Sequence, residues 1–143
     1  MKLLILNGPN LNMTGFREPE IYGARTMDEI IKDLSVRSEK LGIGIDHVIT
    51  NYEGKLIDEL QTAHERYDGV LLNAGALTHY SYALRDAIAA CRIPVGEIHM
   101  SDILARESFR ANDVIFDVCA FRVMGLGEES YFRGVEEMAK LLI

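Results

Sequence analysis

The sequence predicts a three-layer α/β fold in which helices cover both faces of a five-stranded, mainly parallel sheet. Short apolar runs alternate with helical patterns along most of the 143 residues, as right-handed strand–helix–strand crossovers require. The first run, residues 2–7 (KLLILN), lacks the polar alternation of a half-exposed strand and therefore suits a strand buried on both faces. The length fits one domain, so we expect a single domain over residues 1–143.

A helix is predicted to begin after Thr26. Thr26 can act as its N-cap, and Glu29 three residues later completes a capping box. Gly42 is a suitable stop. Between them, apolar residues recur at helical spacing: Met27, Ile30, Ile31, Leu34 and Leu41.

The same alternation continues to the end of the chain. Further strands are predicted at 44–50, 69–76, 94–100 and 114–119, and further helices through 56–63 and at 81–91 and 130–142. Five strands in this length indicate a flavodoxin-like three-layer sandwich.

Composition excludes some classes of function. The formal net charge of −7 argues against a nucleic-acid surface, which needs a basic face. It does not argue against a small anionic substrate, because a few local arginines can outweigh a diffuse acidic background.

The apolar start is too short to be a secretory signal or a membrane span, since polar and turn-forming residues at 7–9 end it. Cys91 and Cys119 lack CxxC spacing, and the four histidines form no HExxH pattern. We therefore expect buried, reduced thiols, no metal and a cytoplasmic protein.

Ligands of open parallel sheets bind beyond the carboxyl ends of the strands, near the topological switch point. The segments that follow the predicted strands are 7–22, 52–54, 73–79 and 97–110. These four segments hold nearly every unusual residue of the sequence, so we expect the functional site among them.

A long stretch at about 8–25 separates the first strand from the first predicted helix. Loops of this length in compact domains are usually lids or disordered linkers, and this one carries Phe16 and Ile21, which a linker would mostly lack. A lid is the better interpretation. Its Arg17 and Tyr22 are then candidate functional residues, the alternative being an exposed ion and a packing ring.

Glu97 and His99 close the fourth predicted strand. Residues two apart share a strand face, and a carboxylate beside an imidazole favours its charged form. His99 would then be a ready proton donor. The alternative is a polar pair that only ends a strand.

Two further segments contribute candidates. In 73–81, Asn73 follows a strand, and His79 lies at a helix start, where anions bind; Thr78 could be only an N-cap and His79 only a surface residue. Residues 101–113 suggest a short helix with Arg106 and Arg110 on one face. The alternative for Arg106 is an exposed i,i+4 ion pair with Asp102, worth about 0.3–0.5 kcal/mol.

Four strings occur in register with one family: NGPNLN, then REPEIYG, then NAGALTHYS, then EIHMSD followed by RESFR. Through them the chain resembles type II 3-dehydroquinate dehydratase over almost its whole length. The resemblance implies conversion of 3-dehydroquinate to 3-dehydroshikimate in the shikimate pathway, a flavodoxin-like fold, no metal or cofactor, and trimers packed into a dodecamer.

The resemblance also implies catalytic roles. Tyr22 would be the base, with Arg17 beside it on the lid, and His99 the general acid, supported by Glu97. Asn10 would help to hold the water that stabilises the enolate. The chemistry suits these residue types, because an ionised Tyr near pH 7 needs a pKa lowered by about 3 units, which nearby cations favour.

Substrate-binding roles follow in the same way. Asn73 and the backbone around Met100 and Ser101 would bind the substrate carboxylate, and His79 and Arg110 would contact its hydroxyls.

Three further positions complete the carry-over. Arg106 would belong to the basic environment of the tyrosine, and Asp86 resembles a residue offered to a neighbouring subunit's site. Asp102 stands where the family usually has Asn, which places an extra carboxylate near an anionic substrate unless Arg106 neutralises it.

Three other readings differ in class. A flavin or nucleotide binder would need a phosphate loop running straight from strand one into a helix, but Pro9 and the long lid intervene, and 125–130 (GLGEES) is an incomplete glycine motif. A receiver-like module would need acidic residues where Asn7 and Asn73 stand. An inactive oligomeric relative would not need Arg17, Tyr22 and His99 together.

Overall fold

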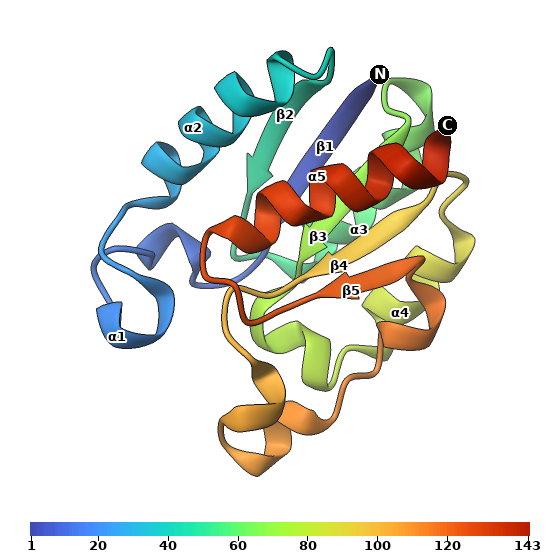
Figure 1. Cartoon of the computed structure of the whole chain (residues 1–143). Helices are drawn as coiled ribbons and strands as arrows, with labels where there is room; N and C mark the ends of the chain where they lie inside the picture. Colours follow the sequence, from blue (N-terminus) through green and yellow to red (C-terminus); the bar gives the residue numbers. More distant parts are fainter.

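Five parallel strands form the middle layer in the order β2-β1-β3-β4-β5 (Figure 1). In this computed structural model the backbone of residues 1–143 and every side chain except that of Tyr22 are described. The strands are β1 (Lys2–Asn7), β2 (Gly44–Ile49), β3 (Gly69–Asn73), β4 (Val95–Ile98) and β5 (Phe121–Val123). The order is that of flavodoxin-like proteins, so the predicted fold class is confirmed.

Two pairs of helices complete the sandwich. The helices are α2 (Met27–Glu39), α3 (Glu53–Thr62), α4 (Tyr82–Ala90) and α5 (Glu129–Leu142). Figure 1 shows α2 and α5 on one face of the sheet and α3 and α4 on the other. Each face has its own apolar cluster, because successive strand residues point to opposite sides. Thr26 and Glu29 form the predicted capping box of α2.

The fifth strand is not where the sequence predicted it. Residues 114–119 contain the 3-10 turn η6 (Phe116–Val118) rather than a strand. Asp113 Oδ1 accepts hydrogen bonds from the backbone N–H groups of Ile115 and Phe116, both at 3.0 Å. Those donors are therefore used locally, and pairing with β4 begins only at Phe121.

The single helix expected at 101–113 was also wrong. Two 3-10 turns occupy the segment, η4 (Ile103–Ala105) and η5 (Ser108–Ala111). Arg106 between them has an extended backbone (φ −110°, ψ −157°), which ends the first turn.

The long connection after β1 is not wholly irregular. It contains the 3-10 turn η1 (Leu11–Met13) and the one-turn helix α1 (Pro19–Tyr22). Asn10 and Glu18 precede these turns with left-handed backbones (φ 70° and 42°), a conformation that lets the chain reverse direction sharply.

The loops after β1 and β3 touch at the switch point of the sheet. The N–H of Gly8 donates to the carbonyl of Asn73 at 2.8 Å. Gly75, with φ +59°, lies so close to Pro9 that an added Cβ would be 2.8 Å from the Pro9 carbonyl oxygen. This contact fixes the two loops that carry Asn10 and Asn73. Among the described residues, no helix has the length and apolarity needed to cross a bilayer.

Candidate active site

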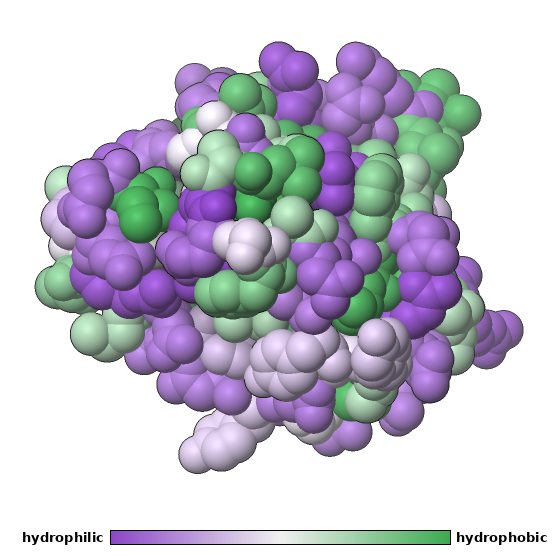
Figure 2. Space-filling view, turned by 90° about the horizontal axis from the view of Figure 1, so that it is seen from below, coloured by the Kyte–Doolittle hydropathy of each residue, from purple (hydrophilic) through white to green (hydrophobic). Residues whose placement is uncertain are grey.

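A hollow opens at the carboxyl ends of β1, β3 and β4. Its lining side chains come from the segments after these three strands: Pro9, Asn10, Leu11, Arg17, Asn73, Gly75, Ala76, His79, His99, Met100, Ser101, Ile103, Arg106 and Arg110. These segments extend below the sheet in Figure 1, and the view from below in Figure 2 shows a mostly hydrophilic face with smaller hydrophobic areas. The expected position of the site is confirmed.

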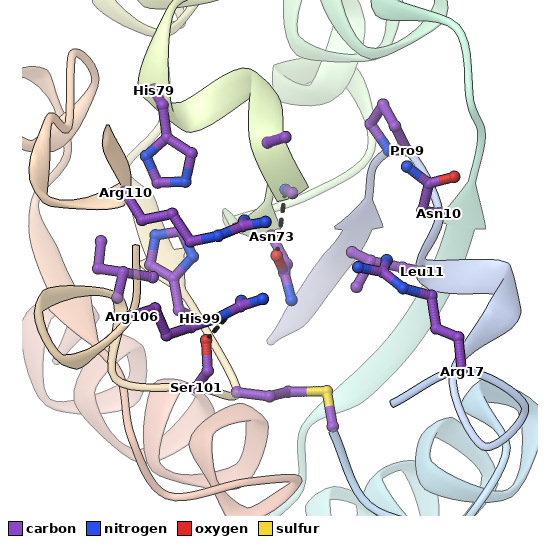
Figure 3. Close-up of a pocket in the computed structure, with 14 residues that line it drawn as sticks. Pro9, Asn10, Leu11, Arg17, Asn73, His79, His99, Ser101, Arg106 and Arg110 are labelled. Carbon is purple, nitrogen blue, oxygen red and sulfur yellow. Dashed lines mark hydrogen bonds between the residues drawn. The ribbon is translucent and has the colours of Figure 1, made fainter. Parts of the chain in front are cut away.

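Three guanidinium groups give the hollow a positive lining. Arg106 and Arg110 enter from the segment after β4, and Arg17 enters from the opposite side (Figure 3). The described residues that line the hollow include no carboxylate. Such convergent cations in a concave site attract small anions despite a net charge of −7.

Glu18 joins the two arginine-bearing segments. Its Oε2 lies 3.7 Å from Nη2 of Arg17 and 3.8 Å from Nη2 of Arg106. Arg106 also donates from Nη1 to Ser101 Oγ at 3.2 Å. Asp102 is exposed and uses its Oδ1 to accept from the Leu104 N–H at 3.0 Å, so it caps η4. Among the described residues, Asp102 therefore does not form the alternative i,i+4 ion pair with Arg106.

His99 and Glu97 meet as their spacing predicted. Nε2 of His99 lies 2.5 Å from Oε2 of Glu97, and the two residues are 5% and 0% exposed. Because Nε2 is engaged, Nδ1 is the ring nitrogen that can serve the hollow. The pair has the reach and the burial to move a proton to a bound molecule.

The expected preference for a charged imidazole was wrong. Burial lowers the pKa of His99 to about 4, which outweighs the nearby negative charge of Asp113. Burial, together with the neighbouring Asp113 carboxylate, raises the pKa of Glu97 to about 10. Desolvation disfavours both charged forms, so at neutral pH the shared proton belongs to the carboxyl side of the pair.

Sequence reasoning missed Asp113 and Arg122, which stand next to Glu97. Arg122 Nη1 lies 3.2 Å from Asp113 Oδ2, and both side chains are largely buried. Ligand-type atoms of Glu97, His99 and Asp113 lie within 4.8 Å of one another, which could hold a metal ion. The guanidinium on Asp113 competes with a cation there. No sequence signal marked them, because both lie just outside the strand predicted at 114–119.

Asn73 is held by a second buried network. Its Nδ2 donates to the hydroxyl of Tyr131 at 3.0 Å, and that hydroxyl donates to Asn7 Oδ1 at 2.6 Å. Asn73 Oδ1 accepts from the Gly75 N–H at 3.2 Å. One N–H of the Asn73 amide remains to face the hollow, as a binding role requires.

His79 is buried and lies inside the 3-10 turn η3 (Gly75–His79) rather than on the surface. Its Nδ1 lies 2.9 Å from the carbonyl of Asn112. A carbonyl can only accept, so Nδ1 carries the hydrogen and Nε2 is left as an acceptor. Burial lowers the pKa of His79. Thr78 is not the cap of α4, because Ser81 accepts from the Leu84 N–H.

Two predicted site residues, Tyr22 and Asp86, are not among the described side chains that line the hollow. The side chain of Tyr22 lies outside the described residues. Asp86 is exposed on α4 and is not part of the lining. The backbone N–H of Asn10 donates to Asn51 Oδ1 at 2.9 Å, which fixes the start of the long connection over the hollow.

Comparison with known proteins gives one consistent result. The model of the family described as "Dehydroquinase class II" matches residues 1–139. A 3-dehydroquinate dehydratase of Bacillus cytotoxicus is 48% identical over 130 residues, which cover 91% of this chain and 89% of that protein. The 3-dehydroquinate dehydratase of Bacillus subtilis is 48% identical over 128 residues, covering 90% and 86%.

A solved structure agrees. The crystal structure of a type II dehydroquinase from Butyrivibrio crossotus superposes with a TM-score of 0.95 at 37% sequence identity, and covers 97% of each chain. Sequence and fold are therefore similar to the same group of enzymes.

Proposed function

The chain belongs to the class II dehydroquinase family and is a 3-dehydroquinate dehydratase, a hydro-lyase, and we propose that it removes water from 3-dehydroquinate by anti elimination through an enolate. The product would be 3-dehydroshikimate, in the shikimate pathway. One observation carries the proposal. The buried His99–Glu97 pair borders a hollow lined by three arginines.

The lining suits an anionic, hydroxylated substrate. The free N–H of Asn73 and the backbone at Met100 and Ser101 would bind its carboxylate. Arg110 and His79 would contact its hydroxyls, His79 as an acceptor through Nε2. Directional donors and acceptors of this kind fix a ligand's orientation within a pocket.

Proton removal is assigned to Tyr22. Its place on α1 puts it five residues from Arg17, and Arg17 and Arg106 both bring positive charge to the hollow. Cations favour the phenolate over the phenol. Closure of residues 8–25 over the substrate would keep bulk water from the enolate.

The leaving hydroxyl is assigned to His99. Hydroxide leaves poorly, so a proton must reach it as the C–O bond breaks. Negative charge develops meanwhile on the former ketone oxygen, and fixed donors there lower the barrier. Asn10, at the start of the long connection, would hold the water that donates to this oxygen.

We further propose a dodecamer built from trimers, in the cytoplasm, without a cofactor. Asp86 is exposed and is not one of the residues that line this chain's own hollow, which suits a residue offered to a neighbouring subunit. Tyr80 and Tyr82, nearby in sequence, are 63% and 67% exposed, and exposed rings favour burial in an interface. Light scattering of the purified protein measures the assembly directly.

An ultraviolet assay with 3-dehydroquinate tests the reaction and the base together. Wild type should generate the conjugated enone absorbance without added metal or nucleotide, and Tyr22→Phe should lose it. Tyr52→Phe is the matched control, because Tyr52 is 77% exposed and lies outside the lining. Activity in Tyr22→Phe would overturn the base, and no product from wild type would indicate an inactive relative.

A further inference from the structure

The carboxyl group of Glu97 lies between His99 and Asp113, and both neighbours affect where its proton is held. On one side its Oε2 contacts His99 at 2.5 Å. On the other side a carboxyl oxygen of Glu97 lies within 4.8 Å of a carboxyl oxygen of Asp113. Arg122 pairs with Glu97 across the β4–β5 ladder, so the two side chains share a sheet face. Four ionisable groups are therefore packed together behind the hollow.

Two carboxyl groups this close together in a buried place do not both ionise, so one of them carries a proton. Asp113 Oδ1 already accepts from two backbone N–H groups and its Oδ2 from Arg122 at 3.2 Å. Burial acts to raise the pKa of Asp113, but the adjoining Glu97 carboxyl and the hydrogen bonds from the backbone and Arg122 bring it below the usual value. Asp113 is thus the anion, and the proton resides on Glu97.

We propose that Asp113 and Arg122 are positioning residues that keep a transferable proton on the Glu97–His99 couple and so set the pH range of the elimination. The inference rests on the proposed function, because it concerns how His99 is supplied as the acid. Neither Asp113 nor Arg122 lines the hollow. They act through Glu97.

The proton path balances with the groups present. The Nδ1–H bond of His99 breaks as the substrate C–O bond breaks, and the departing oxygen leaves as water. The proton on Glu97 Oε2 passes to Nε2 across the 2.5 Å contact, so the imidazole stays neutral. Tyr22 holds the proton taken from carbon, and its return through solvent restores the couple.

Other charged groups near the Glu97–His99 couple also affect whether it holds a proton. Asp113 favours a proton on it, whereas Arg122 and His79 disfavour one. Cys119 lies close to the carboxylates, which together with burial raise the pKa of its thiol, so it stays neutral. Asp113 and Arg122 therefore oppose each other as the two permanent charges beside Glu97.

This opposition gives the test. In rate profiles against pH, the upper pKa of kcat should fall in Asp113→Asn by about 1–3 units, the usual effect of one close charge. In Arg122→Gln it should rise. The Asn oxygen can still accept from Ile115 and Phe116 N–H, so the loop should persist. Asp117→Asn, four residues along, is the control, because Asp117 is exposed and pairs with Arg85.

Titration of the His99 ring nitrogens by NMR provides a second readout that needs no turnover. Opposite shifts in the two variants, with KM and the control profile unchanged, would support the proposal. A uniform loss of kcat in both variants without a shift in either readout would overturn it. So would loss of wild-type activity to a chelator with recovery on adding zinc, since the cluster would then be a metal site. Failure of wild type with 3-dehydroquinate would contradict the function and leave the NMR titration to decide the proton's place.

Discussion

Glu97 Oε2 and His99 Nε2 lie 2.5 Å apart in a place where both residues are almost completely excluded from solvent. Their pKa values move in opposite directions, that of Glu97 up to about 10 and that of His99 down to about 4, mainly through burial. The pair therefore holds its proton as a neutral unit rather than as an ion pair. Both stability and activity should depend on that.

The pH dependence of the free energy of unfolding should reveal the buried proton of Glu97. Its folded pKa lies above the unfolded value of about 4.3, so its contribution is complete below pH 4.3 and is lost as pH rises toward 10. The His99 term has the opposite sense, present above about 6.5 and lost as pH falls toward 4. Glu97→Gln removes only the first term, while its amide N–H can still donate to Nε2 of His99.

The free energy of unfolding of Glu97→Gln should therefore gain on wild type as pH rises from 5 to 9. The difference should grow by at most about 1.4 kcal/mol per pH unit. Urea unfolding at pH 5, 7 and 9 measures it, with the exposed Glu65→Gln as control. Parallel curves for Glu97→Gln and wild type would mean that Glu97 is ionised in the folded protein.

Loss of the Tyr131 hydroxyl should weaken both the fold and substrate binding. Tyr131→Phe leaves Asn7 Oδ1 and Asn73 Nδ2 without this buried partner, which costs about 1–3 kcal/mol. Asn73 would also lose its fixed orientation, so KM should rise. Tyr67→Phe is the matched control, because the Tyr67 hydroxyl bonds to Asp46 away from the hollow; it should lower stability only. An unchanged KM in Tyr131→Phe would remove Asn73 from binding.

Much of the fold was predictable because its signals are local. The capping box at Thr26 and Glu29 and the buried run at 2–7 depend only on neighbours in sequence, and both appear as expected. The fifth strand was predicted in the wrong place because Asp113, outside the predicted run, accepts hydrogen bonds from the N–H groups of Ile115 and Phe116. An apolar pattern in the sequence cannot reveal such side-chain hydrogen bonds.

The candidate site also has features that the sequence could predict and features that it could not. Arg17, Arg106 and Arg110 follow strand ends, and the carboxyl-edge rule for parallel sheets was enough to bring them together. The influence of Arg122 on Glu97 depends on the β4–β5 register, a long-range relation that residue spacing does not contain. The pKa of His99 was misjudged for a related reason, because burial is a property of the folded molecule.

Glu18 should compete with anions for the arginines. Its Oε2 lies within 3.8 Å of both Arg17 and Arg106, so Glu18→Gln should leave more positive charge in the hollow. Exposed pairs of this kind contribute about 0.2–1 kcal/mol, which corresponds to inhibition by inorganic phosphate that is about 1.4- to fivefold tighter. Glu20→Gln, also exposed on α1, is the control. Equal inhibition constants in both variants would show that Glu18 does not screen the site.

We expect Asp102 to cap the turn η4 and not to weaken substrate binding. Its side chain accepts from the Leu104 N–H and does not line the hollow. Asn caps a helical turn about as well as Asp, so Asp102→Asn should leave KM and the unfolding free energy close to wild type. Asp102→Ala should lose about 0.5–2 kcal/mol of stability. Steady-state kinetics and urea unfolding of the two variants separate these effects, and a KM that falls severalfold in Asp102→Asn would show that the carboxylate does repel the substrate.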